Sequence, residues 1–368
     1  MERSTGTLES LDLDVSLSPQ FWAGRKVFLT GHTGFKGSWL LLLLRQLGAE
    51  VTGFSLEPPT SPSMFDLLEL STSCHHLIGD IRDQSTLAKA IARAEPDIVL
   101  HMAAQPLVRA SYQLPLETYA TNVMGTANVL DACRHVKTIQ AIVVVTTDKV
   151  YENHGKGVPF TETDALGGHD PYSNSKACAE LVVSAYRDSY FQAAKVGLAS
   201  ARAGNVIGGG DFAEDRIVPD AIRAFHAQKP LLIRNPKARR PWQHVLEPLF
   251  GYLLLAEKLA SDLTYATSWN FGPAAEDARP VSHIVDTLVD LWGPDVSWMH
   301  DQSEQPYEAA ILMLDCSKAN RMMGYTPKWD LEIGLRKTLE WYKCWHDRGE
   351  LRALSQSQIN QFLLIQGV

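Results

Sequence analysis

The chain has 368 residues, of which 45% are hydrophobic and 21% are charged, and its 34 lysines and arginines against 42 aspartates and glutamates give a formal net charge of −8. This composition is typical of a globular protein of about two domains and excludes a disordered chain. The acidic balance excludes a protein whose main partner is a nucleic-acid backbone, because neutralising phosphates requires a basic face.

Residues 1–19 are polar and acidic with no clear period, and they predict a mobile extension rather than a signal peptide. The longest apolar run, residues 39–44, is too short to span a membrane. The five cysteines are scattered and include no C-x-x-C pair, and the neighbouring His75 and His76 have no third ligand at metal spacing. We therefore expect a cytoplasmic protein with no membrane partner, no nucleic-acid partner and no bound metal.

From residue 25 onward, short β-branched runs alternate with longer helical stretches. The predicted strands are residues 26–30, 50–55, 75–80, 97–102, 141–147 and 196–202, and the predicted helices are 38–47, 84–93, 116–136 and 172–193. Apolar strands separated by helices predict a parallel sheet that is covered on both faces. We expect an α/β fold, a Rossmann-type doubly wound parallel sheet that binds ligands at the carboxyl ends of its strands.

After residue 203 the alternation stops, and glycine, proline and arginine become frequent. Residues 20–203 are therefore predicted to form the sheet domain. Residues 204–368 are predicted to form mainly a smaller substrate-binding domain at the C-terminal end, with segments near 240–275 returning to the large domain.

A glycine-rich turn, GHTGFKG at residues 31–37, follows the first predicted strand and opens the first predicted helix. Glycines three residues apart allow a tight turn, a close approach of the backbone to a pyrophosphate, and close packing of the helix on the strand. Such a turn can also merely connect a strand to a helix. Because the strand, the spacing and the helix agree, the pattern predicts a dinucleotide site formed by Gly31, Thr33, Gly34, Phe35, Lys36 and Gly37.

Two later positions concern the adenosine half of the dinucleotide. A carboxylate at the end of the second strand normally binds the ribose hydroxyls of NAD. Here that position is Ser55, with Glu57 two residues on, and a serine does not exclude the phosphate of NADP. Asp80 and Ile81, after the third strand, are candidates for the adenine edge, although Asp80 fits the start of a helix-capping turn equally well.

A tyrosine and a lysine four residues apart, Tyr172 and Lys176, lie at the start of a predicted helix. On a helix they share one face, with side-chain stems about 5–6 Å apart. An ammonium near a phenol stabilises the phenolate, which would make Tyr172 a base for a sugar hydroxyl. The alternative is a surface pair of a kind that is common on helices.

Three polar residues, Thr147, Asp148 and Lys149, close the apolar fifth strand on the sheet edge where the glycine turn lies. A hydrophobic core does not need polar residues at that position. Asp148 and Lys149 also fit an exposed ion pair that begins a loop.

The glycine turn, TTDKVY at residues 146–151 and PYSNSK at 171–176, in this order, resemble the extended short-chain dehydrogenase/reductase family and its members that act on nucleotide sugars. The resemblance runs from about residue 21 to the carboxyl end and is closest to the 4,6-dehydratases of CDP-glucose. It rests also on HMAAQPLVR (101–109), TNVMGT (121–126), RAGNVIGGGD (202–211), IRNPKARRPWQHVLEP (233–248), WNFGP (269–273) and LDCSKAN (314–320). The related dTDP-glucose and GDP-mannose dehydratases carry Asp-Glu where this chain has Asp148-Lys149, so a glutamate base cannot be carried over.

The resemblance implies an NAD-dependent enzyme that removes water from CDP-glucose and forms a 4-keto-6-deoxy sugar. In such an enzyme Tyr172, helped by Lys176 and Thr147, removes the proton of the 4-hydroxyl. The cofactor set that it implies adds Ala103, Ala104, Gln105 and Asn122 to the residues of the glycine turn, Ser55, Asp80, Ile81, Tyr172 and Lys176. The implied substrate set is Gln105, Arg109, Thr147, Asn205, Arg216 and Arg240.

The two residues after Thr147 divide the elimination between them. Asp148 is the candidate acid and must be protonated near neutral pH, which desolvation or anionic neighbours favour. Lys149 is the candidate base, which requires a neutral amine, or it stays charged and stabilises the enolate. The sequence leaves both roles of Lys149 open.

Two other functions share part of these features. A nucleotide-sugar 4-epimerase shares the oxidation step but needs neither the acid nor the base at positions 148 and 149. A non-catalytic NAD-binding protein would not need Thr147, Tyr172 and Lys176 together. The predicted helices at 116–136 and 172–193 resemble the pair that forms an intersubunit four-helix bundle in this family, so we expect at least a homodimer.

Overall fold

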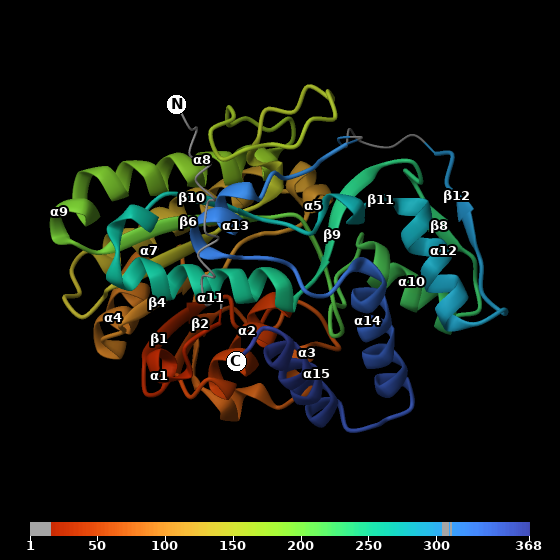
Figure 1. The fold of residues 1–368 in the computed structure, drawn as a ribbon, viewed down its shortest axis with the longest axis horizontal. Helices are drawn as coiled ribbons and strands as arrows, with labels where there is room; N and C mark the ends of the chain where they lie inside the picture. The colour runs from red at the N-terminus through yellow and green to blue at the C-terminus, as the bar shows by residue number, and fades with distance from the viewer. Residues whose placement is uncertain (1–15, 304–308, 310) are drawn as a thin grey trace, which may run out of the picture.

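The computed structural model describes residues 16–303, 309 and 311–368. Seven parallel strands form its central sheet in the order β10-β6-β5-β4-β1-β2-β3 (Figure 1). Their bounds are β1 Lys26–Thr30, β2 Glu50–Ser55, β3 His75–Ile78, β4 Ile98–His101, β5 Ala141–Val145, β6 Gly197–Ala203 and β10 Ser268–Phe271. The predicted Rossmann-type α/β fold is confirmed.

Alternate residues of the strands point to opposite faces of the sheet, and each face has its own hydrophobic core. Val27 and Leu29 of β1 belong to the core that contains α2 (Phe35–Gln46) and α11 (Leu246–Ser261). Phe28, between them, belongs to the core that contains residues of α4 (Gln84–Ala94), α7 (Gly125–Cys133) and α8 (Pro171–Tyr186). The strands are buried on both sides, which explains why their sequences are apolar throughout.

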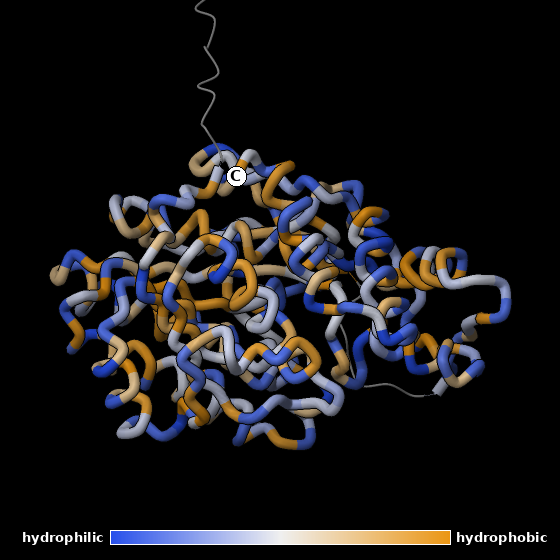
Figure 2. The backbone as a smooth tube through the Cα atoms, turned by 90° about the horizontal axis from the view of Figure 1, so that it is seen from below, coloured by the Kyte–Doolittle hydropathy of each residue, from blue (hydrophilic) through white to orange (hydrophobic). Residues whose placement is uncertain are grey.

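A smaller lobe lies beside the sheet, on the right in Figure 1, and is built from later parts of the chain. Figure 2 shows it projecting from the larger body, whose interior contains many hydrophobic segments. A three-stranded sheet, in the order β11-β9-β7, and a two-stranded sheet, β12-β8, accompany this lobe. The remaining elements are β7 Asn205–Ile207, β8 Leu231–Ile233, β9 Arg239–His244, β11 Ala278–Pro280, β12 Trp298–His300, α10 Ile217–His226, α12 Val281–Trp292, α13 Ser317–Met323 and α14 Leu331–His346.

The predicted helices exist, but two of them are interrupted. The stretch predicted at 116–136 consists of α6 (Pro115–Tyr119), a π-helical turn at Ala120–Met124, and α7. The stretch predicted at 172–193 consists of α8, a π-helical turn at Arg187–Phe191, and α9 (Gln192–Ala194). Helix α2 begins at Phe35 rather than at 38, because Gly34 of the glycine turn is its N-cap.

Segments from both ends of the chain and from its later half pack on the large body. Strand β10 is an edge of the seven-stranded sheet, and α11 covers one of its faces. The C-terminal helix α15 (Leu351–Ile365) joins the same body, where the Arg352 guanidinium donates to the Leu68 carbonyl at 3.0 Å. Of the predicted mobile extension, residues 1–15 lie outside the described residues, whereas Leu17 is buried and the Ser18 amide donates to Glu257 at 2.9 Å.

The described part of the chain also contains three short α-helices: α1 Pro19–Trp22, α3 Met64–Leu67 and α5 Val108–Gln113. None of the helices in the described ranges has the length and apolar character that crossing a membrane requires. All five cysteines are free thiols.

Candidate active site

The glycine turn leaves β1 at the sheet edge that collects the carboxyl ends of the strands. Gly31 has a positive φ of 77°, and a Cβ there would come within 2.7 Å of the Ala103 amide nitrogen. A Cβ on Gly37 would come within 2.0 Å of the Gly31 carbonyl oxygen. These two glycines are therefore required by the packing of the turn itself.

Gly34 differs, because a Cβ on it would meet its nearest protein atom, the Gly31 carbonyl oxygen, at 3.4 Å. Gly34 is the N-cap of α2 and offers no side chain to the amides of the first turn. Those amides lack partners within the helix and carry its positive dipole end. The space at Gly34 and these amides together suit a pyrophosphate, as the glycine pattern predicts.

The predicted adenosine residues lie around the ends of β2 and β3. The Ser55 hydroxyl lies 2.7 Å from the Thr33 hydroxyl, so the end of β2 is tied to the glycine turn. The Asp80 carboxylate accepts from the Arg82 amide at 2.8 Å and from its guanidinium at 2.6 Å. Asp80 thus shapes the turn before α4, whose N-cap is Asp83. Ile81 is buried beside Gly125.

The predicted residues after β4 hold the loop at 103–105 against α8. The Ala103 amide donates to the Thr30 hydroxyl at 3.1 Å, and Ala104 follows it in the same loop. The Gln105 amide donates to Asn122, whose side chain donates to Ser175 of α8 at 2.9 Å. The Gln105 side chain is turned into its own loop, where it bonds Leu107 and Thr118.

Tyr172 and Lys176 are both buried on α8, close to the end of β5. Lys176 donates to the Val145 carbonyl at 3.1 Å. Burial lowers the pKa of Lys176 to about 8, although the Glu180 carboxylate opposes the shift. Burial raises the pKa of Tyr172 to about 12, against the hydrogen bond with Thr147, and Asp148 adds to the rise. This shift is opposite to the sequence-based expectation, because desolvation of the phenolate exceeds the stabilisation that its neighbours provide.

Asp148 lies directly after Thr147 and is completely buried. Its Oδ1 accepts from the Thr147 hydroxyl at 3.0 Å and lies 3.5 Å from the Lys149 amine. Its Oδ2 has no hydrogen-bond partner within the described part of the chain. Gly204 adjoins it, since a Cβ there would lie 3.0 Å from Oδ2. Because Asp148 Oδ2 has no partner among the described residues, it is available to form a hydrogen bond with a ligand bound beside Tyr172.

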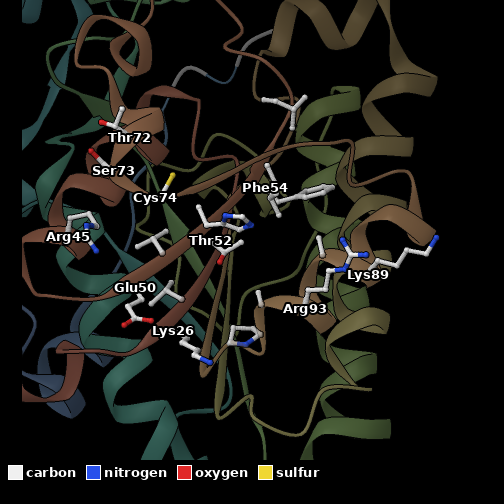
Figure 3. Close-up of a pocket in the computed structure, with 18 of the residues that line it drawn as sticks. Lys26, Arg45, Glu50, Thr52, Phe54, Thr72, Ser73, Cys74, Lys89 and Arg93 are labelled. Carbon is white, nitrogen blue, oxygen red and sulfur yellow. The ribbon is translucent and has the colours of Figure 1, made fainter.

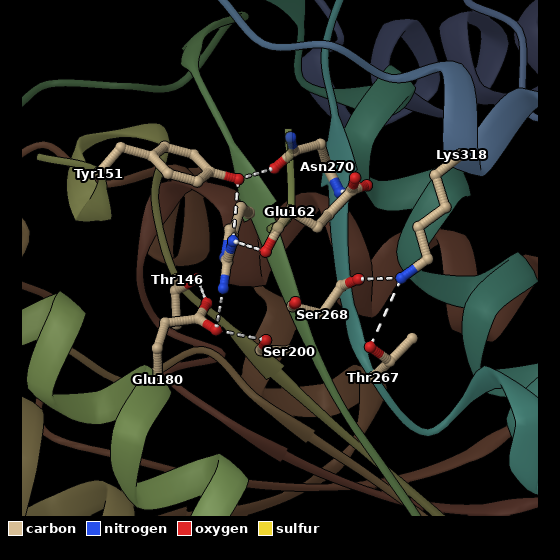
Figure 4. Close-up of polar contacts among 10 residues, drawn as sticks. Thr146, Tyr151, Glu162, Glu180, Ser200, Thr267, Ser268, Asn270 and Lys318 are labelled. Carbon is tan, nitrogen blue, oxygen red and sulfur yellow. Dashed lines mark hydrogen bonds and ion pairs between the residues drawn. The ribbon is translucent and has the colours of Figure 1, made fainter. Parts of the chain in front are cut away.

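A buried polar network lies behind these residues (Figure 4). The Glu180 carboxylate, one helical turn after Lys176, accepts from Thr146, from Ser200 at 2.6 Å and from Arg202 at 2.8 Å. Arg202 also donates to the Tyr151 hydroxyl at 2.9 Å, which in turn donates to Asn270 at 2.6 Å. The network therefore holds residues 146 and 151, on either side of the predicted catalytic residues 147–149, against α8 and the sheet.

Four of the predicted substrate residues, Arg109, Asn205, Arg216 and Arg240, lie on four different elements. Arg216, at the start of α10, pairs with Asp211 at 2.9 Å, and Arg109 of α5 pairs with Asp215 at 3.1 Å. Asn205 begins β7, and its buried Oδ1 has no partner among the residues described. Arg240 is buried in β9 and donates to the Arg239 carbonyl at 3.0 Å.

Several contacts in this site were not predicted from the sequence. The Lys36 amine donates to the Tyr252 hydroxyl of α11 at 3.0 Å, and nothing in the sequence marks Tyr252 as a neighbour. Glu180 and Arg202 lie within or beside matched segments, but a single sequence gives no signal that they pair. Trp39 of α2 donates to the Gly209 carbonyl at 2.9 Å, which attaches the loop of residues 208–210 to this helix.

A cavity of about 680 Å³ lies away from this cluster (Figure 3). It is lined by Lys26 and Glu50, which begin β1 and β2, and by Lys89 and Arg93 of α4. Lys26 and Glu50 lie at the amino ends of their strands, opposite the sheet edge that carries the glycine turn. No group of three or more potential metal ligands occurs in residues 16–303 and 309–368 as far as they are described.

Comparisons with known proteins agree on one family. Residues 28–338 match the family described as GDP-mannose 4,6 dehydratase. The CDP-glucose 4,6-dehydratase of Salmonella typhimurium is 49% identical over 353 residues, covering 94% of this chain and 98% of that protein. The dTDP-glucose 4,6-dehydratase of Neisseria gonorrhoeae is 28% identical over 336 residues, covering 86% of this chain and 95% of that protein.

Solved structures share the fold at lower identity. A dTDP-glucose 4,6-dehydratase from Streptomyces venezuelae, solved with NAD bound, superposes with a TM-score of 0.75 at 23% identity, covering 88% of this chain and 98% of that one. A UDP-glucuronic acid 4-epimerase from Bacillus cereus superposes with a TM-score of 0.75 at 24% identity, covering 86% and 98% of the two chains. At this identity the superpositions show the common fold and do not distinguish dehydration from epimerisation.

Proposed function

The chain belongs to the GDP-mannose 4,6-dehydratase family, and from this premise we propose that it converts CDP-glucose to CDP-4-keto-6-deoxyglucose with NAD as its resident cofactor. The substrate follows from the 49% identity to the Salmonella typhimurium enzyme over nearly the whole of both chains. The observation that carries dehydration is the buried Asp148 carboxyl, with its neighbour Lys149, beside Tyr172. A 4-epimerase requires neither an acid nor a base at positions 148 and 149.

The order of the reaction follows from the acidity of the sugar protons. The proton on carbon 5 of a hexose is not acidic until carbon 4 has become a ketone, so oxidation must precede the loss of water. Bound NAD would accept a hydride from carbon 4 and return it to carbon 6, which leaves the overall reaction redox-neutral. The protein must supply a base at the 4-hydroxyl, a base at carbon 5 and an acid at the 6-hydroxyl.

Oxidation is assigned to Thr147, Tyr172 and Lys176. Tyr172 removes the proton of the 4-hydroxyl, and Thr147, its hydrogen-bond partner, orients that hydroxyl. With a pKa of about 12 the phenol holds its own proton at neutral pH, so the step needs positive charge close to Tyr172. Lys176 provides such a charge, because a pKa of about 8 leaves it largely protonated at pH 7.

Elimination is assigned to Asp148 and Lys149. Asp148 gives a proton to the departing 6-hydroxyl through Oδ2, the oxygen that has no partner among the described residues. Lys149 acts at carbon 5, as the base or as a cation that stabilises the enolate. The 3.5 Å between the Lys149 amine and Asp148 Oδ1 gives a short path for a proton from carbon 5 to the leaving oxygen.

The remaining assignments concern binding. The amides that follow Gly34 would hold the pyrophosphate of NAD, and Thr33 and Ser55, which are hydrogen-bonded to each other, would lie beside its ribose. Arg216 and Arg240, with Asn205, would hold the phosphates of the sugar nucleotide, because guanidinium groups bind phosphate oxygens in a bidentate manner. Gln105 and Arg109 are assigned to the sugar end of the cleft. We place the enzyme in a reducing compartment such as the cytoplasm, where five free thiols remain reduced.

A homodimer is part of the proposal. Leu116 of α6 is 84% exposed and Leu181 of α8 is 60% exposed, and the two helices are neighbours joined by the hydrogen bond from Tyr119 to Asn174 at 3.0 Å. Exposed leucines on adjoining helices are typical of a helical interface between subunits. The interface would contain α8, which also carries Tyr172 and Lys176.

The test is to incubate the purified protein with CDP-glucose, dTDP-glucose, UDP-glucose and GDP-mannose, each with and without added NAD, and to analyse the products by mass spectrometry. We expect the loss of one water from CDP-glucose and from none of the others. Tyr172→Phe removes one oxygen from the proposed base and should abolish the reaction. Tyr190→Phe makes the same change on an exposed helix position and should leave it intact.

Other outcomes would replace the proposal. A product of unchanged mass but altered sugar stereochemistry would establish an epimerase. No change in any nucleotide sugar, from a protein that still binds NAD, would establish a non-catalytic binding protein.

A further inference from the structure

A second cavity, of about 670 Å³, lies in the smaller lobe between α10 and the end of α14. Its volume is within the range of small-molecule sites. Among the described residues that line it, five carry aromatic or imidazole rings, two are arginines, and none is an aspartate or glutamate. The glycine turn and the residues assigned to catalysis and to the substrate are not part of its walls. The cavity is therefore separate from the candidate active site.

The rings of the cavity form a connected group. The imidazoles of His226 on α10 and His346 on α14 lie 4.4 Å apart, centre to centre, with their planes 31° apart. Trp345 lies 5.8 Å from His226 and 5.1 Å from Phe212. The buried Nε2 of His226 has no hydrogen-bond partner among the described residues, which leaves an unsatisfied polar atom at the wall. Rings grouped around a cavity favour a flat aromatic ligand, because rings gain from stacked and edge-on contacts.

The charge of the cavity is positive. Arg348, two residues after α14, is exposed and forms no ion pair or side-chain hydrogen bond with the part of the chain that the structure describes. Arg223 on α10 pairs with Asp220 and donates to the carbonyls of Phe212 and Ala213, each at 3.1 Å. The charge of Arg348 is thus uncompensated, and a guanidinium binds phosphate and carboxylate groups through paired hydrogen bonds. The ligand that suits this cavity is an anion.

Three residues of the walls also hold the loop that leads to Arg216. Phe212 belongs to that loop, and Arg223 holds the carbonyls of residues 212 and 213. The Tyr342 hydroxyl donates to the Asp211 carbonyl, and the Asp211 carboxylate pairs with Arg216 at 2.9 Å. A ligand that packs on Phe212 therefore contacts the loop that positions Arg216, the residue assigned to the phosphates of the sugar nucleotide.

We propose that this cavity is a second binding site, whose ligand is a small aromatic anion, a planar ring that carries a phosphate or a carboxylate. The ring lies among Phe212, Trp345 and the two imidazoles, and the acid group lies on Arg348. The site itself does not depend on the proposed function, but its influence on Arg216 rests on it. Because linkage is reciprocal, the ligand and the sugar nucleotide change each other's affinity by the same factor.

The test is isothermal titration calorimetry of the purified protein with phenyl phosphate and with benzoate. We expect at least one of them to bind once per chain, and the tighter of the two identifies the acid group. Inorganic phosphate lacks the ring and phenol lacks the charge, so each should bind more weakly than the better probe by about tenfold or more.

Substitutions locate the binding. Trp345→Ala removes a ring of the cavity and Arg348→Gln removes its uncompensated charge, so each should weaken binding of the probe by about tenfold. Arg348 is exposed, so its replacement should leave the fold intact. Arg336→Gln, at an exposed position of α14 outside the cavity, is the matched control and should bind the probe as the wild type does.

A kinetic measurement tests the influence on Arg216. In the wild type, saturating probe should change the KM for CDP-glucose by about twofold or more. In Arg348→Gln the same concentration of probe should leave the KM unchanged, and without the probe this variant should have the kcat and KM of the wild type.

The outcomes separate this inference from the proposed function. If neither probe binds, or if binding persists unchanged in Trp345→Ala and Arg348→Gln, the site is overturned. Binding that both substitutions weaken, with a KM that the probe does not change, would overturn the influence on Arg216. A protein that binds the probe in the cavity but converts no nucleotide sugar would count against the proposed function alone.

Discussion

At the scale of single residues, the three glycines of the turn at 31–37 differ in the space around them. Gly31 and Gly37 lie against backbone atoms of the protein, so a Cβ on either has no room. Gly34 has room for a Cβ in the protein's own packing. The protein's own packing therefore does not demand glycine at position 34, and in the proposed function the pyrophosphate of NAD would lie against it.

We expect Gly34→Ala to fold normally and to bind NAD at least tenfold more weakly, because the new methyl group occupies the space at the start of α2. Gly37→Ala should instead lower the thermal stability, since its Cβ would lie 2.0 Å from the Gly31 carbonyl oxygen. Thermal unfolding and NAD titration of the two variants provide the check. Equal losses of stability in both would show that position 34 is also a packing position.

Lys149, which the proposed function assigns to elimination together with Asp148, gives a second prediction at this scale. We expect Lys149→Arg to lose activity as severely as Lys149→Ala, by about 10²–10⁴ in kcat, because a guanidinium does not give up its proton and cannot act as a base. Both variants should still oxidise the sugar, so the absorbance of reduced NAD should accumulate when CDP-glucose is added. Near-normal turnover of Lys149→Arg would make the base role untenable and leave electrostatic stabilisation.

At the scale of elements, the ion pair between Glu180 and Arg202 joins α8 to β6 behind the proposed catalytic residues. Burial alone would raise the pKa of Glu180, but the hydrogen bonds and charge of Arg202 lower it, so the carboxylate is ionised. That ionised carboxylate in turn raises the pKa of Lys176 against the effect of burial. The network thus supports the charge of Lys176 as well as the position of residues 147–149.

A pH profile tests this connection. Glu180→Gln removes the charge that holds up the pKa of Lys176, so that pKa should fall below about 8. If Lys176 must be protonated for oxidation, activity is lost as pH rises through its pKa, and the alkaline limb of the kcat profile should move to lower pH. Glu152→Gln, an exposed glutamate in the same region of the chain, should leave the limb unchanged. A Glu180→Gln enzyme with lower kcat but an unmoved limb would reduce the network to a structural role.

The elements themselves were largely predictable, because each strand and helix carries its own pattern. The strands at 26–30 and 50–55 were predicted to the residue, since buried parallel strands are apolar throughout. The start of α2 was missed because an N-cap glycine has no side-chain signal. The pairing of Lys36 with Tyr252, 216 residues apart, depends on the packing of α2 against α11, which no local pattern reports.

The electrostatics of Tyr172 show a second limit of the sequence. The spacing of Tyr172 and Lys176 predicts a phenolate stabilised by an ammonium. In the structure the Lys176 amine donates to the Val145 carbonyl. Burial of the Tyr172 phenol is the largest influence on its pKa, and it raises that pKa. The sequence identifies which groups meet, but the desolvation that determines their protonation depends on the surrounding fold.

At the scale of the whole molecule, α8 carries both the proposed catalytic pair and part of the proposed dimer interface. One side of it carries Tyr172 and Lys176 toward the carboxyl ends of the strands, and Leu181 on another side is exposed to solvent. In the proposed dimer, that exposed side would pack against a second copy of the chain. The position of the catalytic pair would then depend in part on assembly.

We expect the wild-type protein to be at least a dimer at micromolar concentration, and the double variant Leu116→Glu, Leu181→Glu to be a monomer, because charges replace the exposed leucines of α6 and α8. Light scattering after size-exclusion chromatography measures both. Leu232→Glu makes the same change at a leucine of β8 that is 58% exposed, and should leave the assembly intact. Since α8 also carries Tyr172 and Lys176, the monomer should lose kcat more than it loses affinity for CDP. A monomeric wild type, or a double variant that assembles normally, would show that this face is not the interface.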